Sequence, residues 1–346
     1  MTRQAPTLED VAREAGVSRA TVSRVVNGIR NVAPDIQDAV REAIERTGYA
    51  PNRAARALVT RRAETIALVV SGAGGESEQE QSAFASRMLT DPFFGRVVGG
   101  VITFLRPRSM YPVLMFAETA EARRQVVSYL RQGSADGALV FSTHAADPLP
   151  TLLADADLPC ALFARPPAGT AVSHVDVDHR EGGRLAADRL AARGCRRVAT
   201  VTGPLDLPAA RDRLDGFQTA MARHGQPVVP VREGDFTAAG GAAAMHWLLA
   251  EHPDTDGVFA ANDLMAIGVM EAAGETGRRV PDDVAVIGFD DSGVAAAGRP
   301  PLTTVRQPME EMAATMARLL QEQIEGTRTT PASVVFDAEL VVRASA

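Results

Sequence analysis

Short apolar runs alternate with amphipathic stretches along the chain from residue 65 onward. Uninterrupted apolar runs of this length are typical of strands buried on both faces of a parallel sheet. The runs fall into two series, TIALVV (65–70), YPVLMF (111–116), GALVF (137–141) and PCALF (159–163), then HVDV (174–177), RVATV (197–201), GVFA (257–260), VAVIGF (284–289) and VVF (334–336). This pattern predicts an α/β core of two doubly wound parallel-sheet subdomains with a cleft between them.

The first 50 residues carry helical patterns and no strand pattern. Thr7 and Asp10 have the spacing of a capping box, and Gly16 ends the helix that they begin. Ser18 can cap a second helix, and a third helix follows Pro34. Two short helices joined at a Gly-Val-Ser turn, with a third packed behind them, have helix-turn-helix geometry.

The second of these helices has one apolar face and one polar face. Val22, Val25 and Val26 share the apolar face. The opposite face carries Arg19, Ala20, Ser23, Arg24 and Asn27. Arginine can bond guanine bidentately, serine can bond phosphate, and alanine can contact a thymine methyl group. The pattern therefore suits a helix in the major groove, but it also fits an ordinary three-helix bundle with a solvated polar face.

The distribution of charge separates the two parts of the chain. The formal net charge of the whole chain is −7, which by itself argues against a nucleic-acid partner. Residues 1–62, however, hold 11 arginines and 7 acidic residues, which gives them +4 and leaves −11 for the remainder. A basic head on an acidic body indicates two separate tasks in one chain.

The segment TLEDVAREAGVSRATVSRVVNG (residues 7–28) resembles the DNA-binding head of the LacI/GalR (lac repressor/gal repressor) family of bacterial transcriptional regulators. The similarity continues through NVAPDIQDAVREAIERTGYAPNRAARAL (residues 31–58). The resemblance implies a helix-turn-helix domain over residues 1–50 and a hinge helix over residues 51–62. The residues it assigns to DNA binding are Thr7, Ser18, Arg19, Ala20, Thr21, Ser23, Arg24, Asn27, Asn52, Arg53, Ala55 and Leu58.

The hinge segment is too short to be a stable helix on its own. Asn52 can cap residues 53–60, but eight residues do not offset the cost of helix nucleation in water. In the family this stretch folds on DNA and pairs with its dimer mate in the minor groove. Leu58 then matches the apolar wedge that opens the central base step, with Ala55 beside it. On position alone, a basic linker with a buried leucine is an equal alternative.

The body resembles the periplasmic-binding-protein type 1 fold that forms the family's regulatory core. By this analogy residues 63–346 bind the effector and dimerise, and the chain crosses between subdomains near residues 175, 305 and 333. The expected N-subdomain therefore spans about 63–174 and 306–332, and the C-subdomain about 175–305 and 333–346. A small molecule would bind in the cleft, at the carboxyl ends of the strands.

Loops that follow the predicted strands carry the candidate effector contacts. They are Phe93, Phe94, Arg165, Arg211, Arg213, Phe236, Asn262, Asp263, Asp290 and Gln307. Carboxylate, amide and guanidinium groups around aromatic rings suit a sugar or sugar derivative, and a nucleobase is a second possibility. Each residue also has a structural explanation, since Asp290 and Asn262 can tie loops together, Arg213 can pair with a carboxylate and Phe94 can be core.

Two departures leave the identity of the effector open. Leu207, Pro208 and Ala209 stand where some relatives place polar effector contacts. A Gly- and Glu-rich stretch, residues 72–81, lengthens the loop before DPFF (91–94). The sequence does not indicate whether the effector is an inducer or a corepressor, nor which operator and genes are involved.

These observations predict a cytoplasmic, homodimeric repressor that binds a near-palindromic operator in double-stranded DNA under allosteric control by a small molecule. Neither a membrane-length apolar run nor a signal peptide is present, so a membrane role is not expected. Cys160 and Cys195 lack metal-type spacing, and the six histidines form no HExxH motif. We expect no metal and no cofactor.

Two other classes of protein are alternatives to a repressor. A solute-binding protein would explain the body but leaves residues 1–62 without a task. An α/β enzyme would need a phosphate loop or a nucleophile with its base, and neither a Walker motif nor G-x-S-x-G occurs. His174 and His179 near Asp176 are the best acid–base candidates, but no nucleophile accompanies them. We therefore predict that the chain is not an enzyme.

Overall fold

The computed structural model describes residues 6–26, 32–49, 62–72, 82, 85–86, 88–142, 144 and 146–346. The chain divides into two compact units, residues 1–64 and 65–346, which we call the head and the core. Five predicted DNA-binding residues, Asn27, Asn52, Arg53, Ala55 and Leu58, lie outside the described residues, as does most of the loop 72–81. Among the described residues, no helix is both long and apolar enough to cross a membrane.

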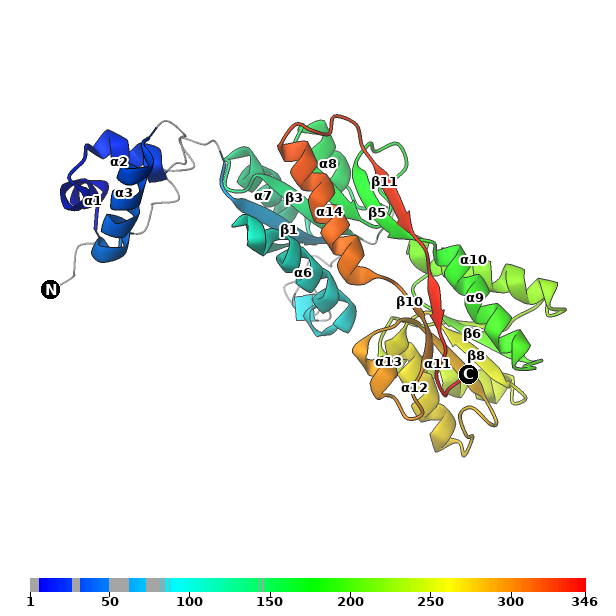
Figure 1. Cartoon of the computed structure of the whole chain (residues 1–346). Helices are drawn as coiled ribbons and strands as arrows, with labels where there is room; N and C mark the ends of the chain where they lie inside the picture. Colours follow the sequence, from blue (N-terminus) through cyan, green and yellow to red (C-terminus); the bar gives the residue numbers. More distant parts are fainter. Residues whose placement is uncertain are drawn as a thin grey trace. The chain divides into compact units, whose positions relative to one another are not determined.

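The head consists of three helices, α1 (Leu8–Ala15), α2 (Arg19–Val26) and α3 (Pro34–Thr47), as predicted (Figure 1). Thr7 and Asp10 form the predicted capping box at the start of α1. Gly16 and Gly48 follow α1 and α3 in the left-handed conformation, which glycine adopts without strain. The helices pack around a small apolar core of Val11, Ala12, Val22, Val40 and Ala43.

The first lobe of the core is built on a six-stranded parallel sheet with the strand order β11-β5-β4-β3-β1-β2. Its strands are β1 (Thr65–Ser71), β2 (Tyr111–Ala117), β3 (Gly137–Ser142), β4 (Cys160–Phe163), β5 (Ser173–Val177) and β11 (Ser333–Phe336). Its helices are α6 (Pro92–Leu105), η1 (Arg106–Arg108), α7 (Ala120–Arg131), α8 (Leu149–Asp155) and α14 (Met309–Ile324). Successive side chains of β1 point to opposite faces of the sheet. Ile66 and Leu68 pack in one apolar cluster with α6 and α14, and Ala67 and Val69 pack in another with α7 and α8.

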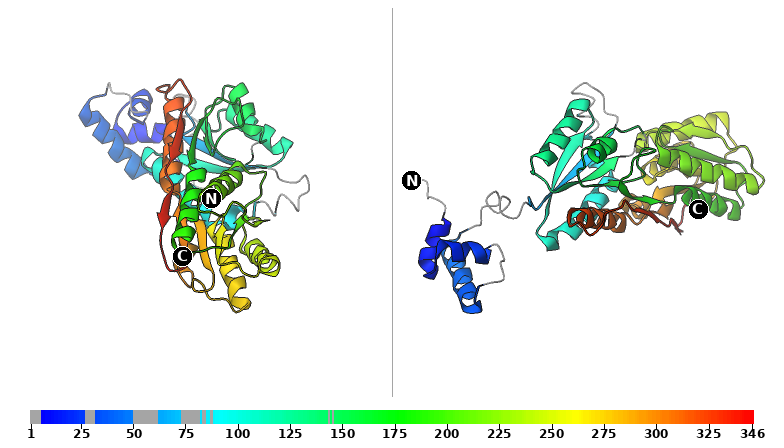
Figure 2. Two further views of the ribbon diagram at one scale, coloured as in Figure 1. Left: turned by 90° about the vertical axis from the view of Figure 1, so that its right-hand side faces the viewer. Right: turned by 90° about the horizontal axis from the view of Figure 1, so that it is seen from above.

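The second lobe repeats this plan with the strand order β12-β10-β9-β8-β6-β7, in which only β12 is antiparallel to its neighbour. Its strands are β6 (Val198–Thr202), β7 (Val231–Glu233), β8 (Gly257–Ala260), β9 (Ala285–Asp290), β10 (Thr303–Arg306) and β12 (Glu339–Val341). Its helices are α9 (His179–Ala192), α10 (Pro208–Arg223), α11 (Ala238–Glu251), α12 (Asp263–Glu275) and α13 (Gly293–Ala297). Apolar clusters lie on both faces of each sheet. The helices of each lobe flank its sheet (Figure 2), which is the doubly wound architecture that the sequence predicts.

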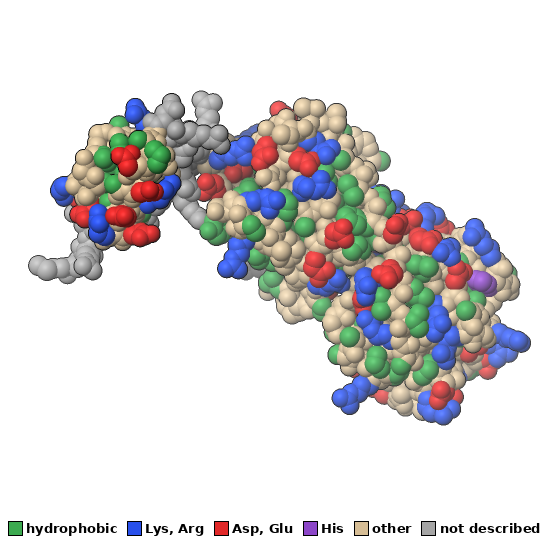
Figure 3. All heavy atoms as spheres, viewed as in Figure 1, with side chains coloured by type: hydrophobic (Ala, Val, Ile, Leu, Met, Phe, Trp, Pro, Cys, Tyr) green, Lys and Arg blue, Asp and Glu red, His purple; other side chains and the backbone are tan. Residues whose placement is uncertain are grey.

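The chain crosses between the lobes three times, each time slightly later than predicted. β5 and β11 pair with each other in the first sheet, so the first and third crossings lie after Val177 and after Phe336. The second lies between β10 and α14. The prediction that HVDV (174–177) and VVF (334–336) belong to the second series is therefore wrong, because a short run does not reveal which of two sheets it joins. Charged side chains of both signs are interspersed over the face of the core that Figure 3 shows.

Candidate functional site

The exposed face of α2 is the candidate DNA-reading surface of the head. Val22 is fully buried beneath the helix, which fixes the rotation of α2 about its axis. Arg19, Ala20 and Arg24 consequently lie exposed on the outer face, as predicted, while Thr21 and Ser23 are half-buried. The Arg19 Nε lies 2.9 Å from the Glu9 Oε1 in an exposed ion pair, which contributes little and can be exchanged for a phosphate or a base.

The predicted DNA-binding hydroxyls of Thr7, Ser18 and Thr21 have partners within the head. The Thr7 hydroxyl donates to the Asp10 carboxylate at 2.8 Å. The Ser18 Oγ accepts from the Thr21 backbone N–H at 3.1 Å and lies 2.9 Å from the Thr21 hydroxyl. Both Thr7 and Ser18 are exposed, so in this structure they fix the starts of α1 and α2 at the surface of the head.

A cavity between the two lobes of the core is the candidate effector site. It is lined by Met88, Asp91, Phe93, Phe141, Phe163, Ala164, Asp176, His179, Leu207, Ala209, Arg213, Phe236, Asn262, Asp290, Gln307 and Met312. The first lobe supplies an aromatic wall, in which the Phe93 ring meets the rings of Phe141 and Phe163 edge-on at centroid distances of 5.7 and 6.0 Å. Asp91 caps α6 by accepting from the Phe93 N–H at 2.9 Å, which places this ring at the cavity.

The second lobe supplies hydrogen-bonding groups that its own contacts hold in place. Asn262 caps α12 through its Oδ1, which accepts from the Met265 N–H at 2.9 Å, and its Nδ2 donates to the Phe236 carbonyl at 3.0 Å. The Gln307 Nε2 donates to the Asp290 Oδ1 at 2.6 Å. Side chains that are fixed before a ligand arrives lose little conformational entropy when it binds.

Arg213 is the buried cation of the cavity. Its Nε donates to His179 Nδ1 at 3.2 Å, its guanidinium carbon lies 3.7 Å from the centroid of the Phe289 ring, and its Nη1 bonds the Ala261 carbonyl. Its Nη1 also lies 3.9 Å from the Asp290 Oδ1. Burial raises the pKa of Asp290 well above its usual range, and the charge of Arg213 offsets part of that rise.

Four of the predicted effector residues do not line the cavity. Phe94 is buried in the first lobe's core, because consecutive helical residues point in different directions. Arg211 is exposed and bonds the Asp206 carbonyl at 2.9 Å. Arg165 pairs with Asp176 at 2.9 Å and with Asp212, which lies on α10 of the second lobe.

Asp263 is the fourth of these, and its side chain holds two loops of the second lobe together. One oxygen accepts from the N–H and hydroxyl of Ser292 at 2.7 and 2.9 Å, and the other accepts from the Thr304 hydroxyl at 2.5 Å. Burial raises the pKa of Asp263 to about 6, against the lowering effect of these hydrogen bonds. Asp263 therefore has a structural position behind the cavity.

Several cavity residues were not predicted as effector contacts. Phe141 and Phe163 are the last residues of two predicted strands, so the sequence indicates that they lie at the carboxyl edge of a sheet, where ligands bind. Asp176 and His179 were considered only as acid–base candidates. Leu207 and Ala209 line the cavity, so apolar side chains stand at positions where some relatives place polar effector contacts.

His179 is held in its neutral form. Nδ1 accepts from Arg213, so the ring proton is on Nε2, which lies 3.3 Å from the Asp176 Oδ1. Burial, with the charge of Arg213 as the next cause, lowers the pKa of His179 to about 4. Between pH 6.5 and 4 the unfolded chain therefore binds a proton that the folded chain does not, so stability falls as the pH drops through this range.

We expect His179→Gln to reduce the acid sensitivity of the core. Between pH 7 and pH 5, the free energy of unfolding of the parent protein should fall by about 2 kcal/mol more than that of the variant, because only the parent keeps a neutral buried histidine. Urea unfolding at both pH values measures this difference. His246→Gln, at a half-exposed histidine, is the control and should follow the parent. Equal losses in all three proteins would show that His179 is not held neutral.

The described residues contain no cluster of three or more His, Cys, Asp or Glu side chains suited to a metal ion. Burial raises the pKa of the Cys160 thiol to about 12 and that of Cys195 to about 11, so both thiols are protonated at neutral pH. Neither cysteine is poised for nucleophilic chemistry.

Two family models match the chain. The model for bacterial regulatory proteins of the lacI family matches residues 7–52, and that for a periplasmic binding protein-like domain matches residues 187–346. The HTH-type transcriptional regulator CelR of Thermobifida fusca is 45% identical over 347 residues, covering 99% of both chains. The ribose operon repressor of Escherichia coli K12 is 35% identical, covering 88% of this chain and 89% of its own.

Solved structures agree with these relatives. A CelR–cellobiose complex superposes with a TM-score of 0.73 at 43% identity, covering 99% of this chain and 100% of that one. The lac repressor dimer bound to operator and the anti-inducer ONPF superposes with a TM-score of 0.83 at 28% identity, covering 99% of each chain. These relatives are transcription regulators rather than enzymes, as predicted. The chain belongs to the lacI family of bacterial regulatory proteins.

Proposed function

We propose that this regulator is a cytoplasmic, homodimeric repressor whose affinity for a near-palindromic operator is set by a neutral oligosaccharide in the interlobe cavity. The exposed face of α2 reads the operator, together with the hinge segment of residues 51–62. The oligosaccharide is of the cellobiose type, the sugar bound in the CelR complex. Binding of the effector in the cavity changes the angle between the lobes, and this change alters the affinity for DNA.

The observation that carries this proposal is the combination of aromatic rings and hydrogen-bonding groups in the cavity lining. Three of the rings, Phe93, Phe141 and Phe163, lie together on the first lobe, and the carboxyl and amide groups come from both lobes. A pyranose ring has apolar C–H faces and a rim of hydroxyl groups, so it suits such a cavity when its face lies on the rings and its rim meets the amide and carboxyl groups.

The charges around the cavity favour an uncharged sugar over a sugar phosphate. Asp91, Asp176 and Asp290 contribute three carboxyl groups, whereas Arg213 is the one arginine among the described residues that line the cavity. Neutral His179 adds no positive charge. A phosphate group would lose its hydration and gain at most one cationic partner, Arg213, beside three carboxyl groups.

Calorimetric titration of the purified protein tests this proposal. We expect cellobiose to bind with 1:1 stoichiometry per chain, and cellobiose 6-phosphate, ribose and purine bases to give no comparable heat. Binding of a purine base or of the phosphorylated sugar, with no response to cellobiose, would refute the assignment of the effector class.

We propose that the β2 edge of the first sheet is the dimer surface. β2 ends the strand order, and Tyr111, Val113 and Leu114 are exposed along it. Ile102 on α6 is exposed as well. An exposed apolar edge strand pairs readily with another chain, so a second copy of this chain is the partner that we assign to it.

We expect Leu114→Glu to convert the dimer into a monomer, because it places two like charges in the apolar interface. Sedimentation equilibrium measures the mass. Val228→Glu, at the most exposed large hydrophobic residue of the second lobe, is the control and should remain a dimer. A dimeric Leu114→Glu protein would exclude this edge as the interface.

A further inference from the structure

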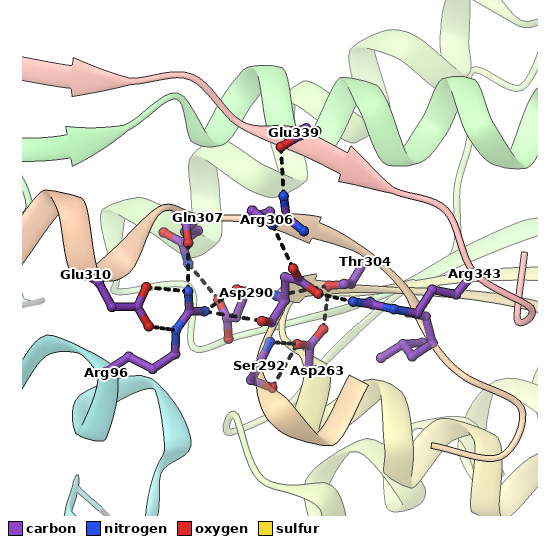
Figure 4. A network of polar contacts seen from close by, with 12 residues as sticks. Arg96, Asp263, Asp290, Ser292, Thr304, Arg306, Gln307, Glu310, Glu339 and Arg343 are labelled. Atoms are coloured by element: carbon purple, nitrogen blue, oxygen red, sulfur yellow. Dashed lines mark hydrogen bonds and ion pairs between the residues drawn. The ribbon is translucent and has the colours of Figure 1, made fainter. Parts of the chain in front are cut away.

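Arg96 lies outside the cavity and, like Arg165, connects the two lobes. Arg96 lies on α6, one turn after Phe93, and its Nη1 donates to the backbone carbonyls of Asp290 at 2.8 Å and Asp291 at 3.3 Å in the second lobe (Figure 4). Its Nε and Nη2 each lie 2.7 Å from an oxygen of the Glu310 carboxylate. The guanidinium group is thus fully engaged between three segments of chain.

The Glu310 contact orders the guanidinium group within the first lobe. Glu310 lies in the first turn of α14, which packs against α6 in the core of that lobe. The two parallel N–H···O bonds fix the plane of the guanidinium group and leave Nη1 directed at the second lobe. Lysine could not reproduce this fork, because its ammonium group is a point charge.

The carbonyls that Arg96 contacts belong to a strained stretch of backbone. Asp290 has φ 111° and Asp291 has φ 51°, although neither is glycine. Such a conformation persists only where the surroundings hold it. On the side of the second lobe, the Asp291 carboxylate accepts from Arg306 at 2.7 Å and from Arg343 at 2.5 Å. On the side of the first lobe, Arg96 holds it.

Arg96 therefore joins the two walls of the cavity without lining it. The carboxyl group of Asp290 faces the cavity, while the carbonyl of the same residue accepts from Arg96. Phe93 and the capping Asp91 stand at the start of the helix that carries Arg96. Opening the lobes would break the bonds to Asp290 and Asp291 but leave the Glu310 fork intact, since both of its partners belong to the first lobe.

We propose that Arg96 is a positioning residue that sets the backbone of Asp290 for effector binding and couples occupancy of the cavity to closure of the lobes. The coupling rests on the proposed function, whereas the positioning of the Asp290 and Asp291 backbone by Arg96 does not. Loss of the fork should weaken effector binding and uncouple it from DNA binding, although no atom of the effector need touch Arg96.

Arg96→Lys tests the proposal, with Arg108→Lys as the matched control. Arg108 ends η1, which directly follows α6, and its Nη1 donates to the Phe104 carbonyl of α6 within the same lobe. We expect Arg96→Lys to weaken cellobiose binding about tenfold by calorimetry. The factor by which saturating cellobiose changes operator affinity should fall at least threefold, and Arg108→Lys should match the parent in both. Glu310→Gln, at a half-exposed position, should give an intermediate effect without loss of the fold.

Hydrogen exchange without ligand provides a second test that does not depend on the effector. Peptides that cover residues 290–297 should exchange faster in Arg96→Lys than in the parent or in Arg108→Lys, while peptides from α11 should not change. If no protein binds cellobiose, the proposed function fails and the exchange result alone decides the role of Arg96. The proposal would be overturned if residues 290–297 exchange at the same rate in Arg96→Lys as in the parent. It would also be overturned if the parent binds cellobiose and Arg96→Lys shows the same cellobiose affinity and the same coupling to operator binding.

Discussion

Arg213→Met should weaken effector binding at least 100-fold, which corresponds to about 2.7 kcal/mol. Arg213 is 5% exposed and stands among His179, Asp290 and the Phe289 ring. Hydrogen bonds to a buried charged group contribute about 1.5–3 kcal/mol each, so losing one to the sugar accounts for most of this effect. Methionine preserves the length of the side chain but supplies no donor.

Arg211→Met is the control for this prediction. It lies two residues away on the same helix, but it is exposed and bonds the Asp206 carbonyl instead of lining the cavity. Calorimetry with cellobiose should give the parent's affinity for Arg211→Met and no measurable binding for Arg213→Met. Operator binding without effector should persist in both, which shows that the proteins are folded. Equal cellobiose affinities in the two variants would remove Arg213 from the effector site.

Arg24→Ala should lower specific operator binding by about 1–3 kcal/mol, the contribution of one bidentate contact to a base. Arg24 is exposed on the outer face of α2, and the buried Val22 holds that face outward. Binding to random duplex should change much less, because an arginine that reads a base edge adds to discrimination rather than to general attraction.

Arg13→Ala separates base reading from loss of charge. Arg13 is an exposed arginine of α1 whose Nη1 lies 3.1 Å from the Asp10 carboxylate. Loss of the Arg13 side chain should change the affinity for the operator and the affinity for random duplex by similar factors. Competition binding at one salt concentration measures the ratio of the two affinities for each variant. If the ratio of operator affinity to random-duplex affinity is the same in Arg24→Ala as in the parent, Arg24 is excluded from the reading face.

Much of the fold could be predicted because parallel strands buried on both faces leave uninterrupted apolar runs. Each predicted run of the core forms a strand in the structure, although β2, predicted as a buried strand, is an edge strand with exposed side chains. β7 and β12 were missed because they are edge strands of three residues, and β10 because its sequence TTVR is mostly polar. The crossings between lobes were displaced for a related reason: the pairing of β11 with β5 depends on contacts between segments more than 150 residues apart, as Ser333 opposite His174 shows.

The candidate cavity could be predicted as a set of loops but not residue by residue. The carboxyl ends of the strands identified the loops of Phe93, Phe236, Asn262, Asp290 and Gln307, all of which line the cavity. In the segment RDR, Arg211 and Arg213 point to opposite sides of α10, and only packing shows that Arg213 faces inward. Asp176 and His179 were overlooked as contacts because no sequence pattern reveals that the first crossing borders the cavity.

Selection of operator DNA in the presence and absence of cellobiose tests the account most directly. The purified protein is mixed with a randomised duplex pool, and the retained fraction is sequenced with and without the sugar. We predict enrichment of a near-palindrome with a central pyrimidine–purine step, and a change of at least tenfold in its retention when cellobiose is present. A palindrome that is retained equally in both arms would contradict control by this sugar, and the absence of any enriched sequence in either arm would contradict the account of a sequence-specific repressor.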